Sequence, residues 1–277
     1  MWNQLKTTLL LAAMTAILVF VGRAIGGAQG MLVAFAFAVF MNFSAYWFSD
    51  KVLLRMYGAQ QVTRAQAPDL YDMVADLAHR ADLPMPKLYV LPQPSPNAFA
   101  TGRNPSHAAV AVTAGILDIV PADELRGVIA HELGHVKNGD ILISTVAATL
   151  AGAISMLAHS AFFFGGRSDD HHGGNPVGAL LALILAPLAA TLIQLAVSRS
   201  REFAADEYGA HLIGTGRPLA RALLKLEAVN QRIPSHIEPA TAHLFIVNPL
   251  SVRGLQALFR THPPTEERVR RLEEMRA

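Results

Sequence analysis

The run His131-Glu132-Leu133-Gly134-His135 has the residue types and the spacing of a hydrolytic metal site. Residues i and i+4 of a helix project from one face, so both imidazoles can reach the same ion. Glu132 follows His131 on that helix, where its carboxylate can accept a proton from a metal-activated water. A pattern with only three fixed positions also arises by chance, so the interpretation requires a helix around it and a third ligand elsewhere.

The residues around this motif predict a helix from about Pro121 to Gly139. Proline suits the first helical position, and Asp123 and Glu124 suit the positive end of the helix dipole. Val128 supplies an apolar residue for burial, and the final glycine suits a C-terminal cap. Such a helix would hold both histidines in the orientation that a metal requires.

The composition is too apolar for an ordinary soluble fold, because 52% of the 277 residues are hydrophobic and only 16% are charged. Four stretches lack charged residues: 7–22, 24–49, 141–166 and 173–198. Each of the last three would form about 39 Å of helix, which exceeds the roughly 30 Å of a bilayer core. We therefore expect about four transmembrane helices. The alternatives are a cleaved signal peptide for the first stretch and buried core helices for the last two.

Lysine and arginine are distributed unevenly around these stretches. If both termini and residues 50–140 lie on one side of the membrane, that side carries 21 of the 23 basic residues, and the other side carries Arg23 and Arg167. Because basic loops stay in the cytoplasm, both termini and the central region are predicted to be cytoplasmic. The lipid bilayer is thus one expected partner.

Two further features of composition exclude classes of function. The chain has no cysteine, which excludes disulfide scaffolds, thiol nucleophiles and cysteine-ligated zinc. The arginines between residues 268 and 276 alternate with glutamates, as in a solvated helix, and no basic cluster contains interleaved aromatic residues. We therefore expect no nucleic-acid partner.

The central region should contain a helix and a small antiparallel sheet. Residues 69–80 have the apolar spacing of a helix, whereas residues 87–91 and 107–113 have that of strands. The segment Asn97-Ala98-Phe99-Ala100-Thr101 would pair with the second strand through a turn at Gly102-Arg103-Asn104-Pro105. Its exposed edge would either bind an extended peptide by strand addition or belong to an ordinary structural hairpin.

A third ligand can be located from topology. The last two apolar stretches form a predicted hairpin, so the segment after it emerges on the membrane face that carries the two histidines. Glu202 and Asp206 stand there at i and i+4, with Ala205 small enough for close helix packing. Glu202 would complete a His2Glu set, and Asp206 would accept a hydrogen bond from a histidine ligand. Taken alone, these two acids are better explained as balancing the charges of Arg199 and Arg201. Together with the histidine motif on the same membrane face, they are better explained as part of a metal site.

These residues together resemble the HtpX family of integral-membrane zinc metalloproteases and, more distantly, the CAAX prenyl proteases. The resemblance covers nearly the whole chain and includes the histidine motif, the segment 97–102 and the segment 198–206. Two further matches are Asn248-Pro249-Leu250-Ser251 and Thr261-His262-Pro263-Pro264-Thr265-Glu266-Glu267-Arg268.

The resemblance implies an α-helical membrane protein with an α+β zincin-like (gluzincin) catalytic domain. It implies one Zn2+ held by His131, His135 and Glu202, with Glu132 as the catalytic acid and base. Residues 97–101 would bind the substrate strand. The implied activity is cleavage of misfolded or damaged membrane proteins in envelope quality control, at the cytoplasmic face of the bacterial inner membrane.

Negative charge that develops on the scissile carbonyl oxygen needs a second donor beside the metal. His262 is the candidate by family resemblance. An alternative role for His262 is to cap a helix that begins near Pro263.

The predicted organisation alternates membrane and cytoplasmic parts. Residues 1–49 form a transmembrane hairpin, 50–140 a cytoplasmic zincin part, 141–198 a second hairpin, and 199–277 the cytoplasmic part with the third ligand. Two other functions stay open. The first is a CAAX-type prenyl protease, against which the small predicted number of spans, four, is an argument. The second is a non-catalytic zinc-containing adaptor, which would have no use for Glu132.

Overall fold

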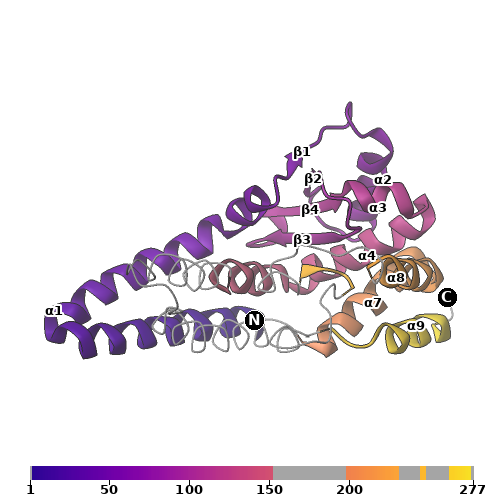
Figure 1. Ribbon diagram of the computed structural model, residues 1–277. Helices are drawn as coiled ribbons and strands as arrows, with labels where there is room; N and C mark the ends of the chain where they lie inside the picture. Colours follow the sequence, from indigo (N-terminus) through magenta and orange to yellow (C-terminus); the bar gives the residue numbers. More distant parts are fainter. Residues whose placement is uncertain (1, 152–197, 231–243, 248–261, 276–277) are drawn as a thin grey trace, which may run out of the picture.

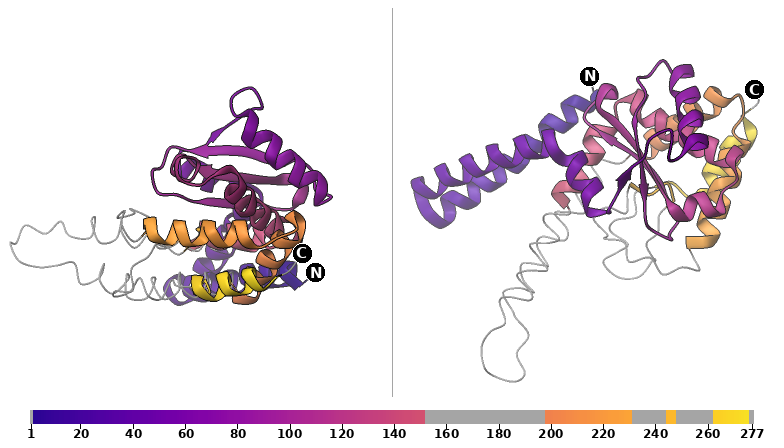
Figure 2. Two further views of the ribbon diagram at one scale, coloured as in Figure 1. Left: turned by 90° about the vertical axis from the view of Figure 1, so that its right-hand side faces the viewer. Right: turned by 90° about the horizontal axis from the view of Figure 1, so that it is seen from above.

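The computed structural model describes residues 2–151, 198–230, 244–247 and 262–275 (Figures 1 and 2). Its helices are α1 (Trp2–Met56), α2 (Pro68–Arg80), α3 (Ala114–Ile119), α4 (Ala122–Asn138), Ile141–Ala151, α7 (Arg199–Ile213), α8 (Arg217–Asn230) and α9 (Thr265–Glu274). The strands are β1 (Gln60–Gln61), β2 (Lys87–Leu91), β3 (Ala98–Gly102) and β4 (Ala108–Thr113), and a 3-10 turn covers Pro105–His107.

α1 consists of two antiparallel arms that extend away from the rest of the chain (Figure 1). The arms join at Gly27, whose φ of +57° lies in a region that glycine adopts readily. Gly22 and Gly30 approach so closely that a Cβ on Gly22 would lie 2.5 Å from the Gly30 oxygen. Asn42 of the second arm donates to the Leu11 carbonyl of the first at 3.2 Å. The first two apolar stretches are thus joined by a tight connection.

The arms of α1 carry an apolar surface. Among the described residues, Gly26–Met56 is long and apolar enough to cross a membrane, and Leu5–Phe20 is a shorter apolar helix. Phe35 and Phe40 of the second arm are 51% and 66% exposed, as expected for side chains that lipid would cover. Ile141–Ala151 begins the third predicted span, but residues 152–197, which contain most of the third and fourth spans, lie outside the described residues.

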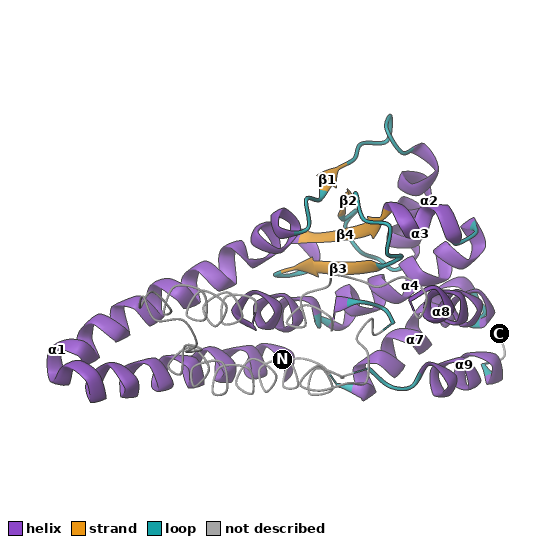
Figure 3. Cartoon of the chain, in the orientation of Figure 1, coloured by secondary structure: helices purple, strands orange, loops and turns teal. Residues whose placement is uncertain are grey.

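The sheet is mixed, so the expected antiparallel sheet is wrong in one pairing. The strand order is β1-β2-β4-β3 (Figure 3). β3 and β4 form the expected antiparallel hairpin, whereas β2 runs parallel to β4. The reason is that β4 inserts between β2 and β3. The chain reverses once after β2 and again after β3, and two reversals make β2 and β4 parallel.

The two faces of the sheet pack against different helices. On one face, Leu88 and Val110 lie in a core with Val74 of α2 and with Val128 and Leu133 of α4. On the other face, the strand residues Leu91, Phe99, Ala109 and Ala111 contact Leu53 and Leu54, near the end of α1. The alternation of side chains along a strand sends neighbouring residues to these two cores. The sheet therefore connects α4 to the apolar arms.

α4, which carries the histidine motif, is bounded by an N-terminal proline and a C-terminal glycine. It begins at Ala122, one residue later than predicted, because Pro121 has an extended ψ of 158° and precedes the helix. It ends before Gly139, whose φ of +70° forms the left-handed cap expected there. Its inner side chains are buried, so packing fixes the direction in which the motif points.

Candidate active site

α4 and α7 cross at a short distance because small residues face each other. A Cβ on Gly209 of α7 would lie 2.9 Å from the His131 backbone nitrogen. A Cβ on Gly134 of α4 would lie 3.1 Å from both the Cα and the carbonyl oxygen of Ala205. Larger side chains at these positions would push the helices apart. The crossing thus brings Glu202, in the first turn of α7, to the histidine face of α4.

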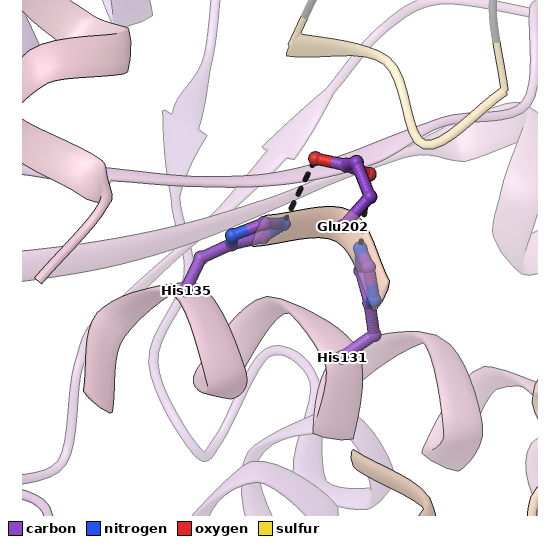
Figure 4. Close-up of side chains that lie close together, drawn as sticks. All are labelled: His131, His135 and Glu202. Atoms are coloured by element: carbon purple, nitrogen blue, oxygen red, sulfur yellow. Dashed lines mark ion pairs between the residues drawn. The ribbon is translucent and has the colours of Figure 1, made fainter. Parts of the chain in front are cut away.

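His131, His135 and Glu202 meet at this crossing (Figure 4). One potential ligand atom from each lies within 4.8 Å of the others. Glu202 Oε2 is 3.8 Å from His131 Nε2, and Glu202 Oε1 is 3.5 Å from His135 Nε2. His131 and Glu202 are buried, whereas the His135 side chain is 17% exposed. The structure thus brings together the three residues that the sequence singled out as metal ligands.

This donor set fits a tetrahedral zinc ion. Bonds of about 2.0–2.2 Å at tetrahedral angles place ligand atoms about 3.3–3.6 Å apart. Glu202 approaches the two imidazoles through different oxygens, at 3.8 and 3.5 Å, and one ligand atom from each residue lies within 4.8 Å of the others, so small side-chain rotations would bring all three to one zinc ion. Two imidazole nitrogens and one carboxylate oxygen are donors that zinc prefers. Three protein ligands also leave a fourth position for water.

The other ring nitrogen of each histidine contacts a carboxylate. His131 Nδ1 lies 2.9 Å from Asp206 Oδ1, and His135 Nδ1 lies 3.3 Å from Asp140 Oδ2. If each imidazole carries its proton on Nδ1, the lone pair of each Nε2 is free and directed toward Glu202. This is the tautomer that a metal-binding histidine needs. Asp206 lies where the sequence analysis expected it. Asp140 was missed, although an acid directly after the capping glycine of the motif helix was a usable signal.

These carboxylates affect the two histidines differently. Burial lowers the pKa of His135, but its hydrogen bond to Asp140 and the charges of Glu202 and Glu132 outweigh burial and raise it to about 9. Burial also lowers the pKa of His131, and there the contact with Asp206 does not outweigh it. In the absence of metal, His135 is therefore the histidine that carries a proton near neutral pH.

Arg268 is buried behind His131, so the predicted solvated helix is wrong at this residue. The guanidinium donates to Asp206 Oδ2 and Oδ1 at 2.8 and 2.7 Å and to the Ile246 carbonyl at 2.7 Å. Burial would raise the pKa of Asp206, but the charge and hydrogen bonds of Arg268 outweigh burial and keep it below its ordinary value. The apolar residues Val269 and Leu272 on the same buried face of α9 were a signal that the charge pattern obscured.

Glu132 is held at the site by the sheet. Its side chain is buried, and Oε2 accepts a hydrogen bond from the Ala100 backbone N–H at 2.8 Å. Burial raises the pKa of Glu132 to about 7, although the positive charge of His135 opposes this shift. A carboxyl group with a pKa near neutrality can both accept and return a proton. This arrangement suits the acid-base role expected from the sequence.

β3 is an edge strand, but its edge is covered and not exposed as expected. Ala98, Phe99, Ala100 and Thr101 are buried, as is the preceding residue Asn97. Ala100 N–H donates to Glu132 and Gly102 N–H to Thr145 Oγ1, so side chains occupy both of these outward N–H groups. Strand addition would have to displace these contacts.

Residues 97–101 contribute unequally to the site cavity. Phe99 and Ala100 line it, whereas Asn97, Ala98 and Thr101 do not. Asn97 instead accepts a hydrogen bond from the Ile246 N–H at 3.1 Å through Oδ1. It thereby ties the strand to the segment 244–247, which covers the site.

His262 lies at the site and does not cap a helix. Its Nδ1 is 3.1 Å from Glu202 Oε2, and its side chain is 7% exposed. α9 begins at Thr265 after Pro264, with no side-chain cap, so the capping alternative is wrong. Arg201 Nε lies 3.6 Å from Asp140 Oδ1.

A cavity of about 40 Å³ adjoins the three potential ligands, Glu132 and His262. Leu244, Phe245 and Ile246 of segment 244–247 are among the residues that line it. The volume is sufficient for one or two water molecules but not for a peptide. Among the described residues, His79, His107 and His211 are not part of this cluster.

Comparison with known proteins identifies the family. The model of peptidase family M48 matches residues 64–276, which is most of the chain. The chain belongs to peptidase family M48. The activity that the motif predicted, that of a metalloprotease, is therefore confirmed by family membership.

The relatives agree with the HtpX resemblance seen in the sequence. A protein named "Protease HtpX homolog" from Sulfurihydrogenibium sp. is 57% identical over 99% of this chain and 97% of its own length. A protein of the same name from Methylibium petroleiphilum is 55% identical over 98% and 97%, respectively. The crystal structure of S. mikatae Ste24p has a TM-score of 0.52 at 19% identity. It is matched over 98% of this chain but only 65% of its own, and it supports the fold alone.

Proposed function

We propose that this M48 protease is a zinc-dependent endopeptidase of the bacterial cytoplasmic membrane that hydrolyses misfolded or damaged membrane proteins. The observation that carries the proposal is the convergence of His131, His135 and Glu202 on one point, with the buried carboxylate of Glu132 beside them. A structural zinc site has no need of an adjacent base, whereas a hydrolytic site requires one.

His131, His135 and Glu202 would hold a single Zn2+. The ion, when bound, supplies Lewis acidity that polarises a scissile carbonyl and acidifies water. Asp206 and Asp140 fix the two imidazole rings, which lowers the cost of arranging the ligands before the metal binds. The ligand geometry is thus set by the protein before the metal is present.

Glu132 accepts the proton of the attacking water and later returns it to the leaving amine. The Ala100 N–H donates a hydrogen bond to Glu132 Oε2 and so holds the side chain in place. Burial raises the pKa of Glu132 to about 7, which suits a group that accepts and returns a proton near neutral pH. The adjacent β3 would align the peptide. For the peptide to bind there, the hydrogen bond from Ala100 N–H to Glu132 must break and segment 244–247 must move away from the cavity. His262, which now contacts Glu202, would turn toward the carbonyl oxygen and stabilise its developing negative charge.

The exposed apolar arms of α1 support the membrane placement. The proposed organisation has four spans, with both termini and the site in the cytoplasm, because 21 of the 23 basic residues then lie on that side. Substrates would reach the site from the membrane surface, since β3 and β4 connect α4 to the end of α1.

Metal content and cleavage together test this function. The full chain and the variants His135→Ala and Glu202→Ala are purified in detergent without metal, incubated with Zn2+ and washed, and bound zinc is counted. One zinc per wild-type chain and loss of zinc in both variants are expected. Wild type should cleave an unfolded membrane protein and leave a prenylated peptide intact. Full zinc content in Glu202→Ala, or cleavage of the prenylated peptide alone, would contradict the proposal.

A further inference from the structure

A second cavity, of about 550 Å³, lies on the other side of the sheet from α4. It is enclosed by the end of the second arm of α1, by β2 and by the turn between β3 and β4. In Figure 1 this turn lies at the end of the sheet that faces the apolar arms. None of the proposed catalytic residues lines this cavity, so it is separate from the active site.

The lining of this cavity is strongly basic. Lys51 and Arg55 come from α1, Lys87 from β2 and Arg103 from the β3–β4 turn, whereas Asp50 is the carboxylate that lines it. Within the described ranges, none of the four cations forms an ion pair. Four cations from three separate elements therefore line one space against a single carboxylate, and Lys51, Arg55 and Lys87 are exposed to solvent. The surplus of positive charge favours an anion in this cavity.

Aromatic side chains adjoin the cations on the side of the apolar arm. The Arg103 guanidinium lies 4.6 Å from the centre of the Trp47 ring, and Lys51 Nζ lies 5.5 Å from that of Phe48. Trp47 and Phe48 are 41% and 44% exposed. Tryptophan, whose ring is amphipathic, concentrates at the headgroup level of a membrane. The cavity therefore opens where Gly26–Met56 would leave the lipid.

We propose that this cavity binds the phosphate headgroup of an anionic phospholipid from the adjoining membrane leaflet. The four cations contact the headgroup, and the acyl chains lie along the exposed aromatic face of α1. Arginine and lysine are the usual phosphate-binding residues, and a basic pocket next to a transmembrane helix is suited to such lipids. The inference rests on the membrane placement proposed above, but not on zinc or catalysis.

Fluorescence of Trp47 can report this binding, because the chain has only two tryptophans. In a Trp2→Phe background, the full chain in neutral detergent is titrated with brominated-chain phosphatidylglycerol or phosphatidylcholine. Quenching by the anionic lipid should be saturable and require at least about tenfold less lipid. Equal quenching by both lipids would overturn the proposal, because it would indicate an unselective lipid shell.

Charge removal identifies the cavity as the cause of this selectivity. Arg55→Gln and Lys87→Gln, which do not contact Trp47, should each weaken anionic-lipid binding by about fivefold. The double variant should respond to both lipids alike, whereas Arg55→Lys with Lys87→Arg should keep the preference. Arg80→Gln with Arg270→Gln removes the same charge from exposed sites elsewhere and should change nothing. Unchanged selectivity in both cavity variants would refute the site.

Competition separates the lipid from other anions. At constant ionic strength, millimolar inorganic phosphate and a poly-glutamate peptide should not displace the lipid. Displacement by phosphate would reassign the cavity to a soluble anion, and displacement by the peptide to an acidic protein segment. Zinc content and peptide hydrolysis are measured on the same samples. Lost hydrolysis with retained lipid selectivity would count against the catalytic proposal alone.

Discussion

Arg268 and Asp206 form a two-point hydrogen-bonded ion pair, at 2.8 and 2.7 Å, with each side chain 2% exposed. Asp206 also lies 2.9 Å from His131 Nδ1, and Arg268 donates to the Ile246 carbonyl of the segment that covers the site. One buried pair thus connects a potential metal ligand, the C-terminal helix α9 and the cover of the cavity.

Arg268→Met should weaken zinc binding by about 10- to 100-fold and destabilise the fold by about 3–5 kcal/mol. The variant leaves the Asp206 carboxylate buried without its cation, and His131 loses a fixed neighbour. Zinc titration against a chelator and thermal unfolding measure the two effects. Arg271→Met, which removes an arginine 43% exposed from the same helix, should have little effect. Equal zinc affinity in both variants would contradict this account.

Zinc binding at pH 8 should release about one proton. Without metal, the carboxylates of Asp140, Glu202 and Glu132 overcome burial and raise the pKa of His135 to about 9, so the ring is protonated at pH 8 and must lose that proton to bind zinc. Calorimetry in two buffers of different ionisation enthalpy gives the number of protons released. Asp140→Asn removes one of these carboxylates, so zinc binding to this variant should release fewer protons. Release of no proton by wild type would show that His135 is already neutral.

Gly209→Val should abolish zinc binding although every ligand side chain is kept. Its Cβ would lie 2.9 Å from the His131 backbone nitrogen, so α7 would move away from α4 and carry Glu202 with it. Zinc content after metal loading is the measurement, and helix content by circular dichroism shows whether the fold remains. Glu207→Val on the exposed face of α7 is the control. A folded Gly209→Val variant with a full zinc complement would contradict the close-crossing argument.

Asn97→Ala should reduce peptide cleavage by changing the cover of the site and not the metal. The change removes the acceptor for the Ile246 N–H and leaves that buried donor unpaired, which costs about 1–3 kcal/mol. We expect unchanged zinc content with a changed KM, because segment 244–247 no longer has a fixed position over the cavity. Comparison with Asn104→Ala, at an exposed turn position, controls for general destabilisation. Loss of zinc in Asn97→Ala would assign the residue to the metal site instead.

The chemistry of the site could be predicted from sequence because its signals are local or forced by topology. The spacing of His131 and His135 is fixed by the helix period, and the predicted hairpin places Glu202 on the same side. The β3–β4 hairpin was also correct, because its turn residues lie between its strands. The parallel pairing of β2 and β4 was missed, since it depends on the insertion of one strand between two others and not on either strand's composition.

Buried charges were the other failure of sequence reasoning. Arg268 lies among glutamates and arginines, so local composition indicated solvent, yet its carboxylate partner is 62 residues away in α7. The contact between His262 and Glu202 likewise joins residues 60 positions apart, whereas Asp140 lies only five residues after His135 and was a local signal. Long-range pairing of this kind leaves no periodic pattern in a single sequence.

The most direct test of the central claim is hydrolysis by Glu132→Gln. The variant keeps all three potential ligands and an oxygen that can accept the Ala100 N–H, but it removes the base. Wild type and variant are purified without metal, loaded with Zn2+, checked for equal zinc content and compared on an unfolded membrane protein. The account predicts loss of at least about 10²-fold in rate with zinc retained. Cleavage at the wild-type rate by the zinc-loaded variant would contradict it.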